Sequence, residues 1–188
     1  MKEIITIRAS NFLSDELAKK VAQMCWGTSA PQYVNCVRKV VFDGLTDEND
    51  CFEVIAETAK GEVVGRVHCI RNETDFSLWC YGDLFVTPEY RRMGIARQMA
   101  ETAISRLSEM GAAVLRCYVD PDNMPSRNLQ KSIGFEEKPF KTFNLLDNDG
   151  EIMYEIKIPS CFCVIPATSD EAYFVRIMFV QNKNELKT

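Results

Sequence analysis

One stretch of the sequence, residues 78–111, constrains the fold more than any other part of the chain. Residues 78–86 are mostly apolar and rich in aromatic side chains, which predicts a β-strand. Residues 95–110 carry apolar side chains at helical spacing and predict an amphipathic helix, with Gly111 as its candidate C-cap. Thr87-Pro88 marks a turn between the two. A strand that leads directly into a helix is typical of α/β proteins.

The other expected elements mix hairpins with strand–helix units, which predicts a mixed α/β sheet. Ser14 is a plausible N-cap for the first helix, and Lys60-Gly61 indicates a tight turn between two β-rich runs. The expected strands cover residues 4–8, 51–57, 63–70, 113–119, 141–146 and 152–158. The remaining expected helices cover residues 14–25, 33–42 and 125–133.

We expect the chain to contain one domain and a C-terminal extension. A length of 188 residues fits one domain, and we assign that domain to residues 1–158. Residues 159–188 are expected to be a C-terminal extension packed on the same domain. Within it, Thr168-Ser169-Asp170-Glu171 matches a capping box and predicts a helix over residues 169–186.

Charge and composition exclude several classes of function. The chain has 22 basic and 27 acidic residues, a net charge of −5, which argues against nucleic acid as a partner and favours a cationic ligand such as an amine. His68 is the single histidine, so a histidine-based zinc site and a Ser/His/Asp triad are both disfavoured, and no metal is expected. The sequence shows no signal peptide, no apolar run long enough for a membrane span and no CxxC pair among its 8 cysteines. These features predict a reduced, cytoplasmic protein with no membrane partner.

The turn before the helix at residues 95–110 has the features of an anion site. Backbone N–H groups at a helix start lack partners and carry partial positive charge. Gly94 lets a ligand approach that backbone, small Ala96 does not block it, and Arg91 and Arg92 stand beside it. This combination suits a phosphate or pyrophosphate. The alternative interpretation is a strand–helix unit with two surface arginines.

At this point the sequence resembles the GNAT superfamily of N-acetyltransferases. Their signature, R/Q-x-x-G-x-G/A after a V-x-P strand end, is matched by Val86-Thr87-Pro88 and Arg91-Arg92-Met93-Gly94-Ile95-Ala96. The family's next block, N-x-x-A/S followed by G-F, is matched by Asn123-Met124-Pro125-Ser126 and Gly134-Phe135. The blocks span about residues 80–136, and the order of elements extends the likeness over most of residues 4–158.

The resemblance implies a mostly antiparallel sheet whose central parallel strands splay apart, with the pantetheine arm of acetyl-CoA between them. It implies that the backbones of Phe85 and Val86 pair with this arm. Asn123 and Ser126 would lie beside it, although an N-cap role for Asn123 and simple packing for Ser126 are equal alternatives. The pyrophosphate would be held by the amides of Arg91, Arg92, Met93, Gly94, Ile95 and Ala96.

The reaction implied is direct attack of a free amine on the acetyl-CoA thioester. A backbone N–H, that of Val86 in our interpretation, would stabilise the oxyanion. Asp83, just before the end of the strand, is the first candidate for the general base, with Tyr81 and Glu57 as alternatives that act through water. The other interpretation of Asp83 is a surface carboxylate without a catalytic role.

The general acid is less clear from the sequence, because this chain departs from the family at one position. Gln130 stands where many relatives carry a tyrosine, and an amide cannot supply a proton as an acid. Tyr118 is the residue that we assign to this role, with Ser132 or water as alternatives. The departure keeps a second function open, a catalytically weak acetyl-CoA sensor. The expected partner is a small-molecule or peptide amine, with a homodimer as an open option.

Overall fold

The structure is a computed structural model that describes residues 4–11, 13–38, 51–138, 151–159, 162–165 and 176–179. Its centre is a seven-stranded sheet in the order β1-β2-β3-β4-β5-β7-β6. The strands of this sheet are β1 (Ile5–Ser10), β2 (Cys51–Thr58), β3 (Val63–Arg71), β4 (Leu78–Val86), β5 (Val114–Val119), β6 (Glu136–Lys138) and β7 (Ile152–Lys157). The helices are α1 (Asp15–Trp26), α2 (Pro31–Arg38), the short 3-10 helix η1 (Pro88–Tyr90), α3 (Ile95–Glu109) and α4 (Met124–Ile133).

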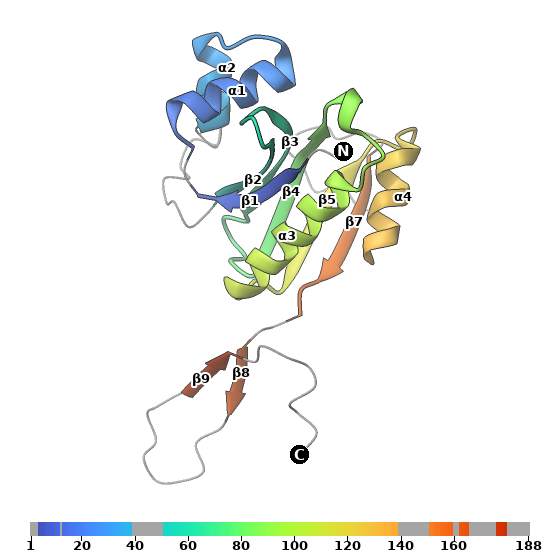
Figure 1. Cartoon of the computed structure of the whole chain (residues 1–188). Helices are drawn as coiled ribbons and strands as arrows, with labels where there is room; N and C mark the ends of the chain where they lie inside the picture. The colour runs from blue at the N-terminus through green and yellow to red at the C-terminus, as the bar shows by residue number, and fades with distance from the viewer. Residues whose placement is uncertain are drawn as a thin grey trace.

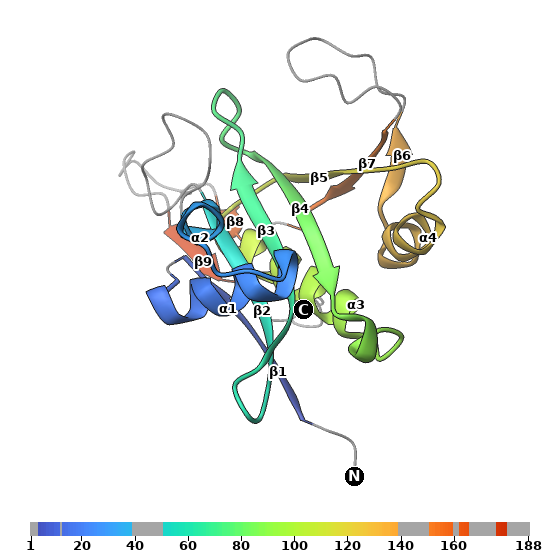
Figure 2. The ribbon, with the colours of Figure 1, turned by 90° about the horizontal axis from the view of Figure 1, so that it is seen from above.

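The sheet is mixed, as the sequence predicts. β4 and β5 are its parallel pair, and the other described neighbours in the sheet run antiparallel. The parallel pairing joins Leu78–Cys80 to 114–116 and goes no further. Beyond that point the two strands diverge (Figure 2). The expected fold class, a mostly antiparallel sheet with a splayed central parallel pair, is therefore confirmed.

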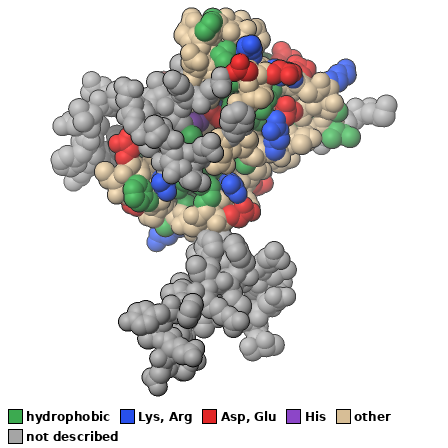
Figure 3. Space-filling model, turned by 90° about the vertical axis from the view of Figure 1, so that its left-hand side faces the viewer, with side chains coloured by type: hydrophobic (Ala, Val, Ile, Leu, Met, Phe, Trp, Pro, Cys, Tyr) green, Lys and Arg blue, Asp and Glu red, His purple; other side chains and the backbone are tan. Residues whose placement is uncertain are grey.

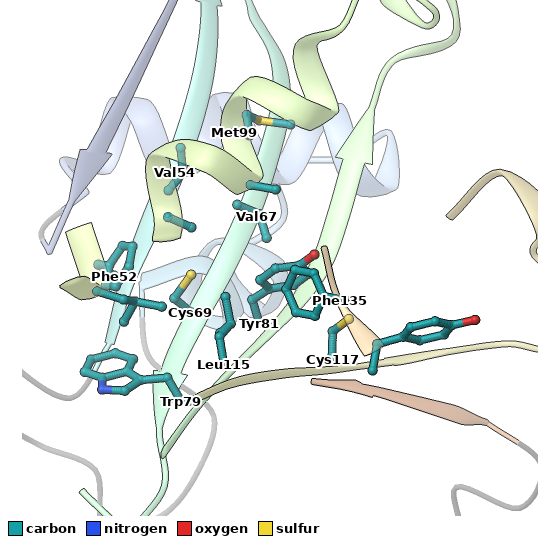
Figure 4. Packing of buried hydrophobic residues seen from close by; sticks show 14 of the residues in the cluster. Phe52, Val54, Val67, Cys69, Trp79, Tyr81, Met99, Leu115, Cys117 and Phe135 are labelled. Carbon is teal, nitrogen blue, oxygen red and sulfur yellow. The ribbon is translucent and has the colours of Figure 1, made fainter. Parts of the chain in front are cut away.

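Helices cover both faces of the sheet (Figure 1). α1 and α2 pack on one face, where Leu17, Val21 and Val34 form a small core with Ile55 of β2. α3 packs on the opposite face, and its buried residues include Met99 and Leu107. The larger core on that face also takes in the aromatic residues Phe52, Trp79, Tyr81, Phe135 and Tyr154 (Figure 4).

Most element boundaries agree with the sequence pattern. β4 begins and ends where predicted, α3 ends one residue early at Glu109, and Gly111 follows it with a left-handed φ of +77°. Ser14 caps α1 by accepting a hydrogen bond from the Leu17 amide at 3.2 Å. α2 begins at Pro31. The later part of the helix expected over residues 33–42 lies outside the described residues.

In the C-terminal third, one expected element is not tested and another is partly wrong. The partner of β7 at the edge of the sheet is β6, which begins at Glu136, whereas the strand expected over residues 141–146 lies outside the described residues. The helix expected over residues 169–186 is wrong at residues 176–179, because these form β9 (Arg176–Phe179), which pairs with β8 (Phe162–Ile165). The capping-box tetrapeptide itself lies outside the described residues. Packing of the extension on the main domain stays a prediction.

The described part of the chain has a face of mixed charge and no helix suited to a membrane. On the face drawn in Figure 3, acidic and basic side chains are interspersed and do not gather into one patch of a single sign. Among the described residues, none of the helices has both the length and the apolar character that crossing a bilayer demands.

Candidate functional site

β4 contains a bulge shortly after its last pair with β5, which is made by Cys80. Arg66 of β3 pairs with Phe85, but His68 pairs with Gly82, so β4 carries one more residue than β3 between these pairs. Asp83 lies in this extra segment with a left-handed φ of +54°. A bulge bends its strand and increases the local twist. The bulge therefore turns the end of β4 away from β5 and opens one edge of β4.

Register decides which backbone groups face this open edge. The Thr87 amide donates to the Val64 carbonyl at 2.9 Å, and alternate residues of an antiparallel ladder point to opposite neighbours. The Val86 amide and carbonyl therefore point away from β3, and the carbonyl accepts a hydrogen bond from Arg91 Nε at 2.9 Å. By the same alternation the Phe85 backbone faces Arg66. The register thus corrects the expectation for Phe85 and supports only Val86 as a backbone group at the opening.

The start of α3 follows the open end of β4 and has no side-chain cap. Gly94 is its N-cap residue with φ +82°, and a Cβ placed there would meet only Gln98 Nε2 at 3.7 Å. Buried Ile95 anchors the first turn in the core, and Met93 packs against that core. The helix start is thus fixed by apolar contacts, while no side chain caps its amides.

Basic side chains flank this helix start. Arg91 and Arg92 are both exposed. Arg91 also lies with its guanidinium carbon 5.8 Å from the centre of the Phe85 ring. Arg92 has a left-handed φ of +63°, which is uncommon for a side chain of this size. Uncapped amides, a glycine and two exposed guanidinium groups form a site that suits a phosphate-bearing ligand.

The start of α4 is different, although this helix also follows one of the parallel strands. Asn123 is its N-cap, and its side-chain oxygen accepts a hydrogen bond from the Ser126 amide at 3.2 Å. The Arg127 amide donates to the Asn123 carbonyl at 3.0 Å. Ser126 itself is half-buried. The structure therefore shows Asn123 in the capping role that the sequence left open.

The two residues assigned to proton transfer lie in different surroundings. Asp83 Oδ2 is 3.5 Å from Arg66 NH2, and the Asp83 side chain is 67% exposed. Tyr118 on β5 is half-buried, and burial raises the pKa of its hydroxyl. Its charged neighbours include Arg116 and Glu151. The structure thus brings Asp83 together with Arg66, whereas Tyr118 belongs to a separate group of side chains.

Gln130 lies deep inside the protein rather than at its surface. It is 1% exposed, and its side-chain oxygen accepts a hydrogen bond from the Tyr81 hydroxyl. Tyr81 also packs edge-on against Phe135, with ring centres 5.6 Å apart (Figure 4). Burial raises the pKa of Tyr81 well above its usual value and raises the pKa of its hydrogen-bond partner Cys117 to about 12. Tyr81 therefore keeps its proton at neutral pH and is a poor general base.

Glu57 and Ser132 each have partners away from the open edge of β4. Glu57 of β2 accepts a hydrogen bond from Arg8 Nε at 2.9 Å across the β1–β2 pair, with β3 between it and β4. The Ser132 hydroxyl donates to the Leu129 carbonyl at 2.7 Å and accepts from Arg97 at 2.6 Å. These contacts favour structural roles for Glu57 and Ser132.

A buried polar cluster next to Asp83 is not foreseen from the sequence. Arg66 donates to both oxygens of Glu53, from NH2 at 2.8 Å and from Nε at 3.2 Å, and both side chains are almost fully buried. His68 Nδ1 lies 2.8 Å from Glu53 Oε1. The only signal in the sequence was the presence of charged residues inside β-rich runs, since these residues are rarely buried unless paired.

Comparison with solved structures supports the fold. A GNAT-family protein from Desulfovibrio desulfuricans matches 83% of this chain and all of its own with a TM-score of 0.63 at 16% identity. The ribosomal-protein-S18-alanine N-acetyltransferase from Escherichia coli matches 91% and 100% with a TM-score of 0.58 at 19% identity. A spermidine N-acetyltransferase chimera from Vibrio cholerae and hSSAT matches 81% and 95% with a TM-score of 0.61 at 16% identity. At such identities the likeness shows the fold alone.

The sequence comparisons add the family. No curated protein matches the chain. A profile of the acetyltransferase (GNAT) family matches residues 15–135, more than half of the chain and a span that contains the bulged β4, the uncapped α3 and the capped α4. The chain therefore belongs to the GNAT family of acetyltransferases.

Proposed function

We propose that the protein is an N-acetyltransferase that moves the acetyl group of acetyl-CoA to a primary amine of a small molecule or peptide, in a ternary complex. The observation that carries this proposal is the uncapped start of α3 beside the open edge of β4. One element offers amides to a pyrophosphate, and the other offers an unpaired strand edge to an extended arm. Membership of the acetyltransferase family supports the same interpretation.

The residues present fit acetyl-CoA as the acetyl donor. The amides of the turn from Arg92 to Ala96 and the two exposed guanidinium groups would hold the pyrophosphate, because helix starts and arginine side chains both favour phosphate oxygens. The Arg91 amide, expected from the sequence to join them, instead donates to the Pro88 carbonyl at 3.2 Å. Gly94 leaves room for a close approach to the backbone. The Val86 amide, directed to the open edge, would pair with the pantetheine arm or meet the carbonyl oxygen of the thioester. Ser126 stays a candidate contact on the α4 side.

Asp83 is the proposed general base. In the reaction the acceptor nitrogen forms a bond to the acetyl carbon, the carbon–sulfur bond breaks, and the CoA thiol leaves. An amine with a pKa near 10.4 needs about 4–5 kcal/mol to lose its proton at pH 7. Asp83 is exposed and lies at the bulge near the start of the opening, so its carboxylate can accept this proton from the acceptor.

Tyr118 is the proposed proton donor to the leaving thiol. Its raised pKa keeps the hydroxyl protonated at neutral pH. Release of an unprotonated thiol with a pKa near 8.5 would cost only about 2 kcal/mol at pH 7. Proton donation by Tyr118 would therefore accelerate the reaction modestly, and loss of Tyr118 is expected to matter less than loss of Asp83.

One observation favours a second candidate function, an acetyl-CoA-binding sensor with weak or no catalysis. Gln130 is buried and bound to Tyr81, so the position that often holds a tyrosine in relatives is filled here by a side chain without an acidic proton. The sensor shares the donor site with the enzyme. Turnover therefore separates the two functions, and binding alone does not.

Calorimetry with acetyl-CoA and a turnover screen by thiol release test both functions together. The screen should cover polyamines, amino acids, aminoglycosides and peptides. Spermidine and a peptide from the ribosomal protein S18 come first, because solved relatives are named for these acceptors. Binding with turnover supports the enzyme, and binding without turnover supports the sensor. If acetyl-CoA gives neither binding heat nor thermal stabilisation, both proposals fail.

A further inference from the structure

The cluster beneath α1 contains a guanidinium group that is held rigidly. Arg66 makes two hydrogen bonds to Glu53, and their side chains are 4% and 6% exposed. Such a two-point contact fixes the plane of the guanidinium group. The ring of Trp26, at the end of α1, lies with its centre 6.0 Å from the guanidinium carbon and covers it. Arg66 therefore has one position in the folded protein.

The fixed guanidinium group has donor capacity left for Asp83. An arginine has five N–H bonds, and Glu53 takes one from Nε and one from NH2. Asp83 Oδ2 lies 3.5 Å from Nη2 of the same guanidinium group, within ion-pair distance, and Cys25 is a further neighbour of Arg66. Glu53 balances the charge of Arg66, and the exposed carboxylate of Asp83 remains open to a cation.

Asp83 needs such a partner to keep a single orientation. Its side chain is 67% exposed, and an exposed aspartate moves freely among staggered rotamers. Its backbone occupies the left-handed region at φ +54°, a conformation that persists only where the surrounding structure enforces it. The contact with buried Arg66 ties an exposed carboxylate to the rigid interior of the sheet.

We propose that Arg66, itself fixed by Glu53, is a positioning residue that holds the Asp83 carboxylate in the orientation needed to receive the acceptor amine. This inference rests on the proposed function and deepens it. Arg66 acts through Asp83 and does not touch the acceptor. Glu53 in turn acts through Arg66.

A kinetic double-mutant cycle tests the proposal with the best acceptor from the screen. Because small misplacements of reacting groups have large kinetic effects, Arg66→Met is expected to lower kcat by about 10- to 100-fold. Asp83→Asn should lower kcat at least as much, and the double variant should be no slower than Asp83→Asn alone. Arg66→Lys should recover part of the activity. Acetyl-CoA affinity should change less than twofold in every variant.

Additive losses in the double variant would contradict the proposal, because they would show that Arg66 acts independently of Asp83. Unchanged kcat in Arg66→Met would contradict it as well. The matched control is Arg8→Met, which removes an arginine from another cross-strand ion pair, the one with Glu57 between β1 and β2. This control should leave kcat within twofold of the wild-type value.

A second variant distinguishes loss of the Asp83 contact from loss of the fold. Removing one member of a buried ion pair leaves the other charge uncompensated, so Arg66→Met alone is at risk of unfolding. The double variant Glu53→Met/Arg66→Met replaces both charges by apolar side chains and still lacks the contact with Asp83. It should remain folded by circular dichroism and show the same loss of kcat as Arg66→Met.

A measurement without acceptor separates failure of this inference from failure of the proposed function. Three-bond NMR couplings should show one χ1 rotamer for Asp83 in the wild type and averaged rotamers in Glu53→Met/Arg66→Met. Unchanged couplings would overturn the positioning role even in an active enzyme. A wild-type protein that turns over none of the amines contradicts the proposed function, while the couplings still decide whether Arg66 holds Asp83.

Discussion

The two helices that follow the parallel strands begin in opposite ways. α3 follows β4 and starts at Gly94 without a side-chain cap, beside two exposed arginines. α4 follows β5 and starts at Asn123, whose side chain binds the Ser126 amide. The loop before α4 is acidic, with Asp120 accepting a hydrogen bond from the Asp122 amide at 2.7 Å.

The difference shows that a strand followed by a helix is not by itself an anion site. A helix start attracts an anion when its amides are left without a protein partner and the neighbouring charges are positive. Both conditions hold at α3, whereas at α4 the Asn123 side chain already binds the Ser126 amide and two aspartates precede the helix. The topology supplies two equivalent positions, and a few side chains leave one open to an anion and use the other for stability.

Gly94→Ala should have the largest effect on the start of α3. A side chain at φ +82° strains the turn, and its methyl group would stand where the phosphates approach the backbone. We expect acetyl-CoA affinity to fall roughly 100-fold, equal to about 3 kcal/mol, by calorimetry. Gly27→Ala is the matched control, because Gly27 has φ +67° and open space around it at the end of α1. It should lose similar stability and keep its affinity, and equal losses of affinity would break the comparison.

Arg91→Ala should have the next largest effect. The change removes one positive charge and the hydrogen bond that Arg91 Nε donates to the Val86 carbonyl. We expect acetyl-CoA to bind about 10-fold more weakly, with a smaller dependence on salt, because a screened charge has been lost. Arg106→Ala serves as the control, since Arg106 lies at the far end of the same helix and pairs with Glu109. Wild-type affinity in Arg91→Ala would remove this arginine from the donor site.

Asn123→Ala should affect stability but not binding. Loss of the N-cap is expected to cost about 1 kcal/mol in the free energy of unfolding, measured by urea denaturation. Acetyl-CoA affinity should stay within twofold of the wild-type value. Asn123→Asp keeps a capping oxygen and should keep most of the stability. A large loss of affinity in Asn123→Ala would instead show that α4 shares the binding role of α3.

Titration of the Cys117 thiol, which lies beside the point where the two parallel strands diverge, should change the free energy of unfolding only at alkaline pH. Its folded pKa is raised to about 12, mainly by burial, whereas an unfolded thiol titrates near 8.5. The folded state therefore holds its proton when the unfolded state has lost it, and stability should fall as pH rises from about 9 to 12. Cys117→Ala should make this fall shallower, while the cavity left by the buried thiol lowers stability equally at every pH. Identical slopes would show that the thiol is not held in a closed interior.

Local patterns predicted the elements near the site well. The strand Leu78–Val86 and the helix after Gly94 have strong periodicity and clear punctuation, and the structure has them where expected. The C-terminal region shows where local patterns fail. A capping box indicates that a helix can begin, but the residues at Arg176–Phe179 pair with another strand, and such pairing depends on distant partners.

The candidate site likewise has one part that local sequence predicts and another part that it does not predict. The uncapped turn at Gly94 is formed by consecutive residues, so the sequence could predict it. The contact between Asp83 and Arg66 depends on the bulge in β4, and the contact between Arg66 and Glu53 depends on the register of β2 and β3. Neither register nor bulge is encoded in the spacing of these residues along the chain. The burial of Gln130 against Tyr81 is likewise a tertiary fact.

The packing behind β4 limits how the opening can be remodelled. A Cβ at Gly65 of β3 would lie 3.0 Å from Met99 Cε and 3.1 Å from the Phe85 carbonyl oxygen, and that backbone oxygen cannot move aside without breaking the ladder. The β3 side of the opening is therefore a fixed wall. Substitutions meant to widen the opening therefore have to be made at positions other than Gly65.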